Sequence, residues 1–135
     1  MRGTTMNKVS KEAKLVLDEL WELATQNDGY YKLNNNPSFM PLTIEKLDGN
    51  QISLCHYGEQ NGDLMRDPEM VYYRDENGDY FPFYFRNDYA GYEEFAGEII
   101  ENKLVINNEE QQKGQVEFTD IWMTNIEYQQ NVLTT

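Results

Sequence analysis

The chain has 135 residues, of which 39% are hydrophobic and 13% aromatic, so it can bury one core, but it lacks the ~20 consecutive apolar residues of a membrane helix. Its 24 acidic and 11 basic residues give a net charge of −13, which argues against direct binding to nucleic acid or to an anionic membrane. A single cysteine, Cys55, excludes a disulfide framework and a thiolate metal site. These properties predict a cytoplasmic protein whose charge favours a basic protein partner.

The N-terminal part of the sequence predicts a tail and then a helix. Residues 1–8 are expected to form a flexible tail, and residues 9–135 a single domain. Ser10 is a good N-cap residue, and apolar side chains recur at helical spacing after it. The predicted helix ends near Thr25, because Gly29 follows and can adopt a left-handed backbone conformation.

The middle of the sequence has the alternation and the turn residues of antiparallel strands. Four strands are predicted, at residues 42–47, 51–57, 69–74 and 80–86. Asp48-Gly49 and Asn77-Gly78 are hairpin signals, since these residue types tolerate the positive φ that tight hairpin turns require. Pro82 cannot donate a hydrogen bond to a neighbouring strand, so the fourth strand lies at a sheet edge or Pro82 lies at a bulge.

The C-terminal half is less regular. Residues 89–100 fit either a short helix or an irregular loop, 103–106 a brief strand and 107–114 a polar loop. A second helix is predicted to begin at Thr119 or Asp120. The expected fold class is therefore α+β, with a four-stranded antiparallel meander sheet flanked by an N-terminal and a C-terminal helix.

The densest group of polar side chains falls between the second and third predicted strands, where we expect a polar loop over residues 59–68. Loops between strands often carry binding sites. The candidate binding residues are Tyr57, Glu59, Gln60, Asn61, Asp63, Arg66, Asp67 and Glu69. Oxygen ligands in this segment could hold a hard cation, but their spacing is not that of an EF-hand, and His56 alone cannot build a zinc site. We therefore predict no metal, no cofactor and no catalytic residue, with Cys55 and His56 on opposite faces of their strand.

A second candidate is an acidic surface in the C-terminal half. Residues 75–135 hold 13 acidic and three basic residues, against 11 and eight in residues 1–74. The candidate surface residues are Glu93, Glu94, Glu98, Glu101, Glu109, Glu110 and Glu117. A contiguous carboxylate surface could imitate the phosphates of DNA, whereas scattered carboxylates would only keep the protein soluble, and both interpretations stay open.

Two runs of the sequence resemble a known family. One is residues 56–71, with Glu-Gln-Asn-Gly-Asp-Leu-Met-Arg-Asp-Pro-Glu at its centre, and the other is residues 118–126. Both resemble a small domain of unknown function found on bacterial plasmids, conjugative elements and phages. That family has no established activity, so the resemblance implies a genomic context and no mechanism. Where the family pattern continues with Gln-Gly-Phe, this chain has Gln129-Gln130-Asn131.

Three functions are compatible with these observations. The first is a non-enzymatic binding protein of a mobile genetic element, in the form of an anti-defence protein or a DNA mimic that inhibits host machinery handling nucleic acid. The second is a small metal- or ligand-binding enzyme centred on residues 56–69. The third is an adaptor domain that docks through exposed Tyr and Phe side chains onto another protein of the same element, as a monomer or a homodimer.

Overall fold

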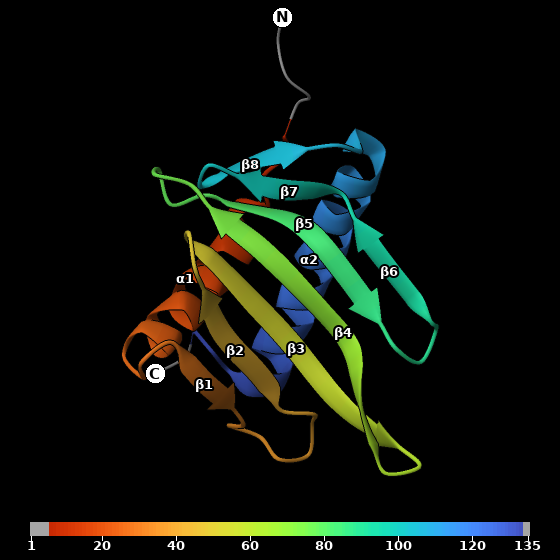
Figure 1. Ribbon diagram of the computed structural model, residues 1–135. Helices are drawn as coiled ribbons and strands as arrows, with labels where there is room; N and C mark the ends of the chain where they lie inside the picture. Colours follow the sequence, from red (N-terminus) through yellow and green to blue (C-terminus); the bar gives the residue numbers. More distant parts are fainter. Residues whose placement is uncertain (1–5, 134–135) are drawn as a thin grey trace, which may run out of the picture.

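The computed structural model describes residues 6–133, which form an α+β fold (Figure 1). The helices and strands in chain order are α1 Lys11–Thr25, β1 Tyr30–Leu33, β2 Leu42–Leu47, β3 Gln51–Gln60, β4 Asp63–Arg74, β5 Tyr80–Asn87, β6 Tyr92–Phe95, β7 Gly97–Ile100, β8 Lys103–Ile106 and α2 Glu109–Gln130. Strands β1 to β6 form one antiparallel sheet in sequence order, and β7 and β8 form a separate hairpin. The α+β class is thus confirmed, but the predicted four-stranded sheet is wrong, because the sheet has six strands.

Both helices cover the same face of the sheet, and the main core lies between them and the strands (Figure 1). Leu17 and Leu20 of α1 and Met123 and Ile126 of α2 are fully buried there. The strand residues that face them are Leu33, Leu42, Ile44, Ile52, Leu54, Met70, Tyr72 and Tyr80. The opposite face is covered only in part, where the β7–β8 hairpin packs on β4 and β5 in a smaller apolar cluster. The sheet therefore has one buried face and one face that is largely open.

Helix α1 is confirmed as predicted, whereas α2 begins ten residues before the earlier of its two expected starts. The Ser10 side chain caps α1 by accepting a hydrogen bond from the Ala13 backbone N at 3.1 Å. Asn108 caps α2 in the same way, so the polar loop expected over residues 107–114 is wrong. The first half of α2 turns Gln112, Gln115 and Thr119 into the protein in place of apolar residues. Its inward face therefore carries no apolar pattern that the sequence could reveal.

The polar loop predicted over residues 59–68 is also wrong, since β3 and β4 continue through it as a long hairpin. Gln60 pairs with Asp63, which leaves Asn61 and Gly62 as a two-residue turn with φ of 53° and 86°. Asn-Gly with positive φ at both positions is the typical signature of a type I′ hairpin turn. The density of polar residues in this segment hid that signal.

The remaining strands differ from the sequence expectations in three places. Strand β1 was not predicted, and residues 89–100 contain β6 and β7 in place of a helix or an irregular loop. Strand β5 lies between β4 and β6, but β6 pairs only with residues 84–87 and, among the described residues, leaves Pro82 without a strand on that side. The register with β4 also shifts beside Pro82, as the bulge alternative requires. Of the predicted tail, residues 1–5 lie outside the described residues, and Asn7 is hydrogen-bonded to Gln112. Within residues 6–133, no helix is both long enough and apolar enough to cross a membrane.

Candidate functional site

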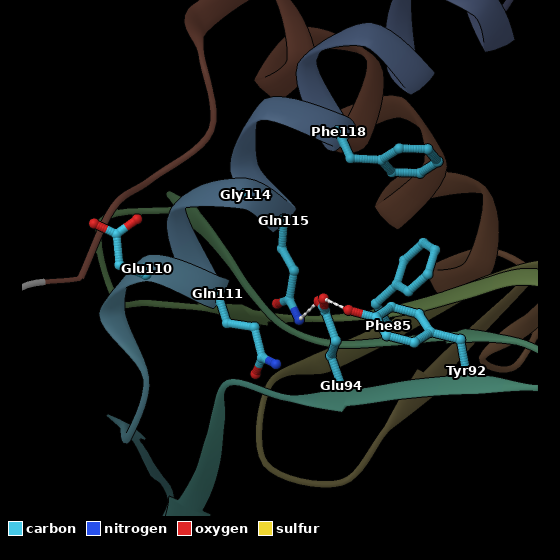
Figure 2. Close-up of a pocket in the computed structure, with 8 residues that line it drawn as sticks. All are labelled: Phe85, Tyr92, Glu94, Glu110, Gln111, Gly114, Gln115 and Phe118. Carbon is cyan, nitrogen blue, oxygen red and sulfur yellow. Dashed lines mark hydrogen bonds between the residues drawn. The ribbon is translucent and has the colours of Figure 1, made fainter.

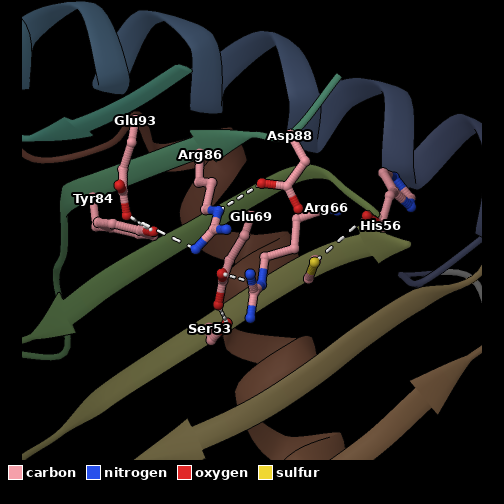
Figure 3. Close-up of polar contacts among 9 residues, drawn as sticks. Ser53, His56, Arg66, Glu69, Tyr84, Arg86, Asp88 and Glu93 are labelled. Atoms are coloured by element: carbon pink, nitrogen blue, oxygen red, sulfur yellow. Dashed lines mark hydrogen bonds and ion pairs between the residues drawn. The ribbon is translucent and has the colours of Figure 1, made fainter. Parts of the chain in front are cut away.

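The open face of the sheet carries a polar cluster on β3, β4 and β5 (Figure 3). Strand pairing places Glu69 opposite both Cys55 and Arg86. The Glu69 carboxylate accepts a hydrogen bond from Ser53 Oγ at 2.8 Å, and Arg66 Nε lies 3.2 Å from its other oxygen. The Glu69 carboxylate is therefore bound by one residue of β3 and one of β4, and the charge of Arg66 offsets its own.

A second ion pair adjoins the first. Arg86 Nε donates to Asp88 Oδ1 at 2.6 Å, and the Arg66 backbone N donates to Asp88 Oδ2 at 2.8 Å. These two hydrogen bonds lower the pKa of Asp88. Tyr84 donates to Glu93 at 2.5 Å, and burial together with this hydrogen bond raises the pKa of Tyr84 to about 12. Every charged group in the cluster thus has a hydrogen-bond or ion-pair partner, and the cluster links neighbouring strands of the sheet.

The structure divides the predicted binding residues between this cluster and the end of the β3–β4 hairpin. Arg66 and Glu69 belong to the cluster, and Tyr57 pairs across the strands with Arg66. Asp67 instead accepts a hydrogen bond from the Asn87 side chain at 3.0 Å. The residues left exposed at the hairpin end are Glu59, Gln60, Asn61 and Asp63. Among residues 6–133, no three His, Cys, Asp or Glu side chains lie close enough together to hold a metal ion.

Cys55 and His56 lie on opposite faces of β3, as their alternation predicts. His56 faces the helices, with its ring 5.5 Å from that of Trp122 and its Nδ1 2.9 Å from the Pro41 carbonyl oxygen. Burial lowers the pKa of His56. Burial and the Glu69 charge raise the pKa of the Cys55 thiol to about 12. At neutral pH the thiol keeps its proton and the imidazole is uncharged, so the two groups do not form a nucleophile–base pair.

The residues of the candidate acidic surface lie on β6, the β7–β8 hairpin and the first half of α2, which adjoin in Figure 1. Glu93 and Glu94 point to opposite faces of β6, the first toward Arg86 and the second toward Gln115 of α2. Its seven glutamates are the ones that the sequence predicts, and all are exposed except Glu94, which is half-buried. Among the described residues, Glu93 alone of the seven is in an ion pair, with Arg86 at 4.0 Å. Glu94 is hydrogen-bonded to Gln115 and Tyr92, and the remaining five side chains are open to solvent.

A pocket opens within this acidic surface, between β6 and α2 (Figure 2). Its volume is about 340 Å³. The residues that line it are Phe85, Tyr92, Glu94, Glu110, Gln111, Gly114, Gln115 and Phe118. The sequence reasoning missed this pocket, because it placed residues 107–114 in a loop. Gly114 in a run of helix-forming residues was the one signal that pointed to it, since an exposed helical glycine needs a reason.

One comparison with known proteins gives a match. A family model described as a domain of unknown function, DUF6908, matches residues 5–132. The chain belongs to the DUF6908 family. No curated protein and no solved structure matches it. The resemblance to a domain of unknown function is thus confirmed, while the bacterial mobile-element setting stays a prediction.

The buried histidine gives this DUF6908 domain a defined pH dependence. Burial lowers the pKa of His56 in the folded state below its ordinary 6.5, so the unfolded chain binds the proton more readily. The contribution of uncharged His56 to the free energy of unfolding is therefore fully present above about pH 6.5. It is lost as the pH falls from there toward the folded-state pKa. We expect H56F to lose this part of the pH dependence. Urea unfolding of both proteins at pH 7.5 and 5.5 measures the difference, and an equal drop in both would contradict the prediction.

Proposed function

We propose that this DUF6908 domain is a non-enzymatic binding protein that docks a basic protein partner on its acidic surface. The observation that carries the proposal is that β6, the β7–β8 hairpin and the first half of α2 together hold seven glutamates, of which Glu93 alone among the described residues is in an ion pair. An unneutralised surface of one sign raises the rate of encounter with a partner of opposite sign and excludes partners of like sign.

The chemistry of the nucleophilic and basic side chains favours binding over catalysis. Cys55 holds its proton and His56 is packed against Trp122, so neither group is prepared to act on a substrate. The carboxylates of the enzyme alternative are separated: Glu59 and Asp63 lie at the hairpin end, Asp67 is hydrogen-bonded to Asn87, and Glu69 is paired with Arg66. In its narrower form, the proposal is a DNA mimic encoded by a mobile genetic element, with a nucleic-acid-binding protein as its target.

The test compares two variants that change the net charge equally. In the first, Glu98, Glu109 and Glu117 of the acidic surface are replaced by lysine. In the control, lysine replaces Glu12, Glu19 and Glu22, which are exposed on α1. Each set contains one glutamate in the first turn of a helix, so the loss of the favourable interaction with the helix N-terminus is matched as well.

We expect a basic protein to be captured from bacterial lysate at low salt by the wild type and by the α1 control, and not by the acidic-surface variant. Titration of the purified partner should then show an affinity that falls with added salt, because exposed charges are screened. Equal capture by all three proteins, or equal loss with both variants, would reject the acidic surface as the docking site.

An adaptor function is the second candidate, because the outer side of α2 exposes apolar side chains. Ile121 and Tyr128 are 63% and 79% exposed and lie two turns apart on that helix. A partner docked there would bind through apolar area, so its affinity would change little with salt and would fall when Ile121 and Tyr128 are replaced by serine. The acidic-surface proposal predicts instead an affinity that falls with added salt and does not change when Ile121 and Tyr128 are replaced.

A further inference from the structure

The pocket between β6 and α2 has a hydrogen-bonded carboxylate at its base (Figure 2). Glu94 Oε1 accepts a hydrogen bond from Gln115 Nε2 at 3.1 Å, and Glu94 Oε2 accepts one from the Tyr92 hydroxyl. The pKa of Tyr92 is raised chiefly by this bond, so its hydroxyl keeps the proton that it donates. Both donors are neutral, and the pocket therefore retains the negative charge of Glu94.

A buried amide oxygen adds an unused acceptor to the same pocket. Gln115 is 3% exposed, and its bond to Glu94 assigns the nitrogen of its amide to that side. Its Oε1 has no hydrogen-bond partner among the described residues. Buried polar atoms in folded proteins nearly always have a partner. This oxygen itself exposes less than 1 Å², so an external donor reaches it only when the Gln115 side chain turns it toward the pocket.

Aromatic rings form one side of the pocket. The ring of Phe85 lies 5.4 Å from that of Phe118 and 6.0 Å from that of Tyr92, both in edge-to-face arrangements. Gly114 leaves the helix side of the pocket open, because a Cβ at this position would have no atom within 4 Å. Ring faces beside a carboxylate attract cations, and no basic residue of the described range 6–133 lines the pocket.

We propose that this pocket binds a guanidinium group, supplied by an arginine side chain of the basic partner. The inference rests on the proposed function and specifies the contact at that same surface. A guanidinium carries several donors in one plane, so it can bond to Glu94 while its flat face lies on the rings. When the Gln115 side chain turns its Oε1 toward the pocket, the same group can bond to that oxygen as well. A lysine ammonium fits less well, since it is more strongly hydrated and offers no flat face.

The direct test titrates blocked arginine, Nα-acetyl-arginine-methylamide, into the ¹⁵N-labelled protein and follows the backbone amide signals by NMR. The citrulline and lysine counterparts are the controls, because citrulline keeps the shape without the charge. We expect saturable shifts of the Tyr92, Glu94 and Gln115 amides with a Kd on the order of millimolar for arginine, as for a single anchored side chain. Lysine should bind at least about fivefold more weakly and citrulline not measurably.

Two variants locate the effect in the pocket. E94Q removes the charge and keeps the shape, and G114L adds a bulky side chain on the helix side, where a Cβ meets no described atom within 4 Å. Each should weaken arginine binding about tenfold or more, whereas E117Q, which makes the same charge change on α2 outside the pocket, should leave it unchanged.

Absence of shifts, equal binding of citrulline or lysine, or equal weakening by E117Q would overturn the inference. In that case the partner could still require the acidic surface in the charge-reversal experiment, so the two proposals can fail separately. Loss of partner binding in the α1 control would reject the proposed function, whereas the result of the arginine titration would still stand.

Discussion

Replacing Trp122 with alanine is expected to lower the free energy of unfolding by about 3–5 kcal/mol, the usual cost of removing a large aromatic side chain from a core. Trp122 is 5% exposed and belongs to the main core between the helices and the sheet. Its ring packs against that of His56 of β3 and lies 5.6 Å from that of Phe118, so it joins α2 to the sheet. A loss of this size is a large part of the stability of a typical domain.

Urea unfolding at pH 7.5 measures the effect. The matched control is I121A, next to Trp122 on the same helix but largely exposed, which should change the free energy of unfolding by no more than about 0.5 kcal/mol. A W122A protein as stable as I121A would mean that α2 does not pack on the sheet as described.

Replacing Gln112 with leucine is expected to cost about 2–3 kcal/mol, although leucine has a similar size and is more hydrophobic. Gln112 is fully buried. Its Oε1 accepts from the Asn7 backbone N at 2.9 Å, and its Nε2 donates to the Asn7 and Pro82 carbonyl oxygens at 2.7 and 3.1 Å. Leucine would leave these backbone groups without a partner, and a buried unpaired carbonyl is costlier than the lost bond itself.

The same unfolding measurement tests this prediction, with Q111L as its control. Gln111 precedes Gln112 on α2 and is only half-buried, so its replacement should be close to neutral. A Q112L protein that is as stable as Q111L, or more stable, would show that the bonds to Asn7 and Pro82 contribute little.

The candidate site could be predicted only in part. The sequence identified Tyr57, Arg66 and Glu69, which do lie on one face of the sheet, but it grouped them with the hairpin-end residues from Glu59 to Asp63. The partners Ser53 and Arg86 were missed, because strand register decides which residues of separate strands meet. The seven glutamates of the candidate acidic surface were selected from charge alone, and the pocket that Glu94 and Glu110 line was not predicted.

Local patterns in the sequence determined the features whose causes are local. Ser10 and the apolar spacing after it define α1, and alternation places Cys55 and His56 on opposite faces of β3. Asn61-Gly62 carried an equally local signal, a turn with two positive φ values, which the surrounding charges obscured. In each case the residue and its nearest neighbours contain the physical cause.

Tertiary structure alone decided the first half of α2 and the pocket beside it. Gln112, Gln115 and Thr119 are polar residues that face inward, and each is hydrogen-bonded to a group distant in sequence: Asn7, Glu94 and Tyr72, respectively. A polar side chain can be buried when the fold places a hydrogen-bond partner beside it, and the sequence does not show which group that partner will be. For that reason charge and strand alternation could be read directly from this chain, whereas the helix that completes its acidic pocket could not.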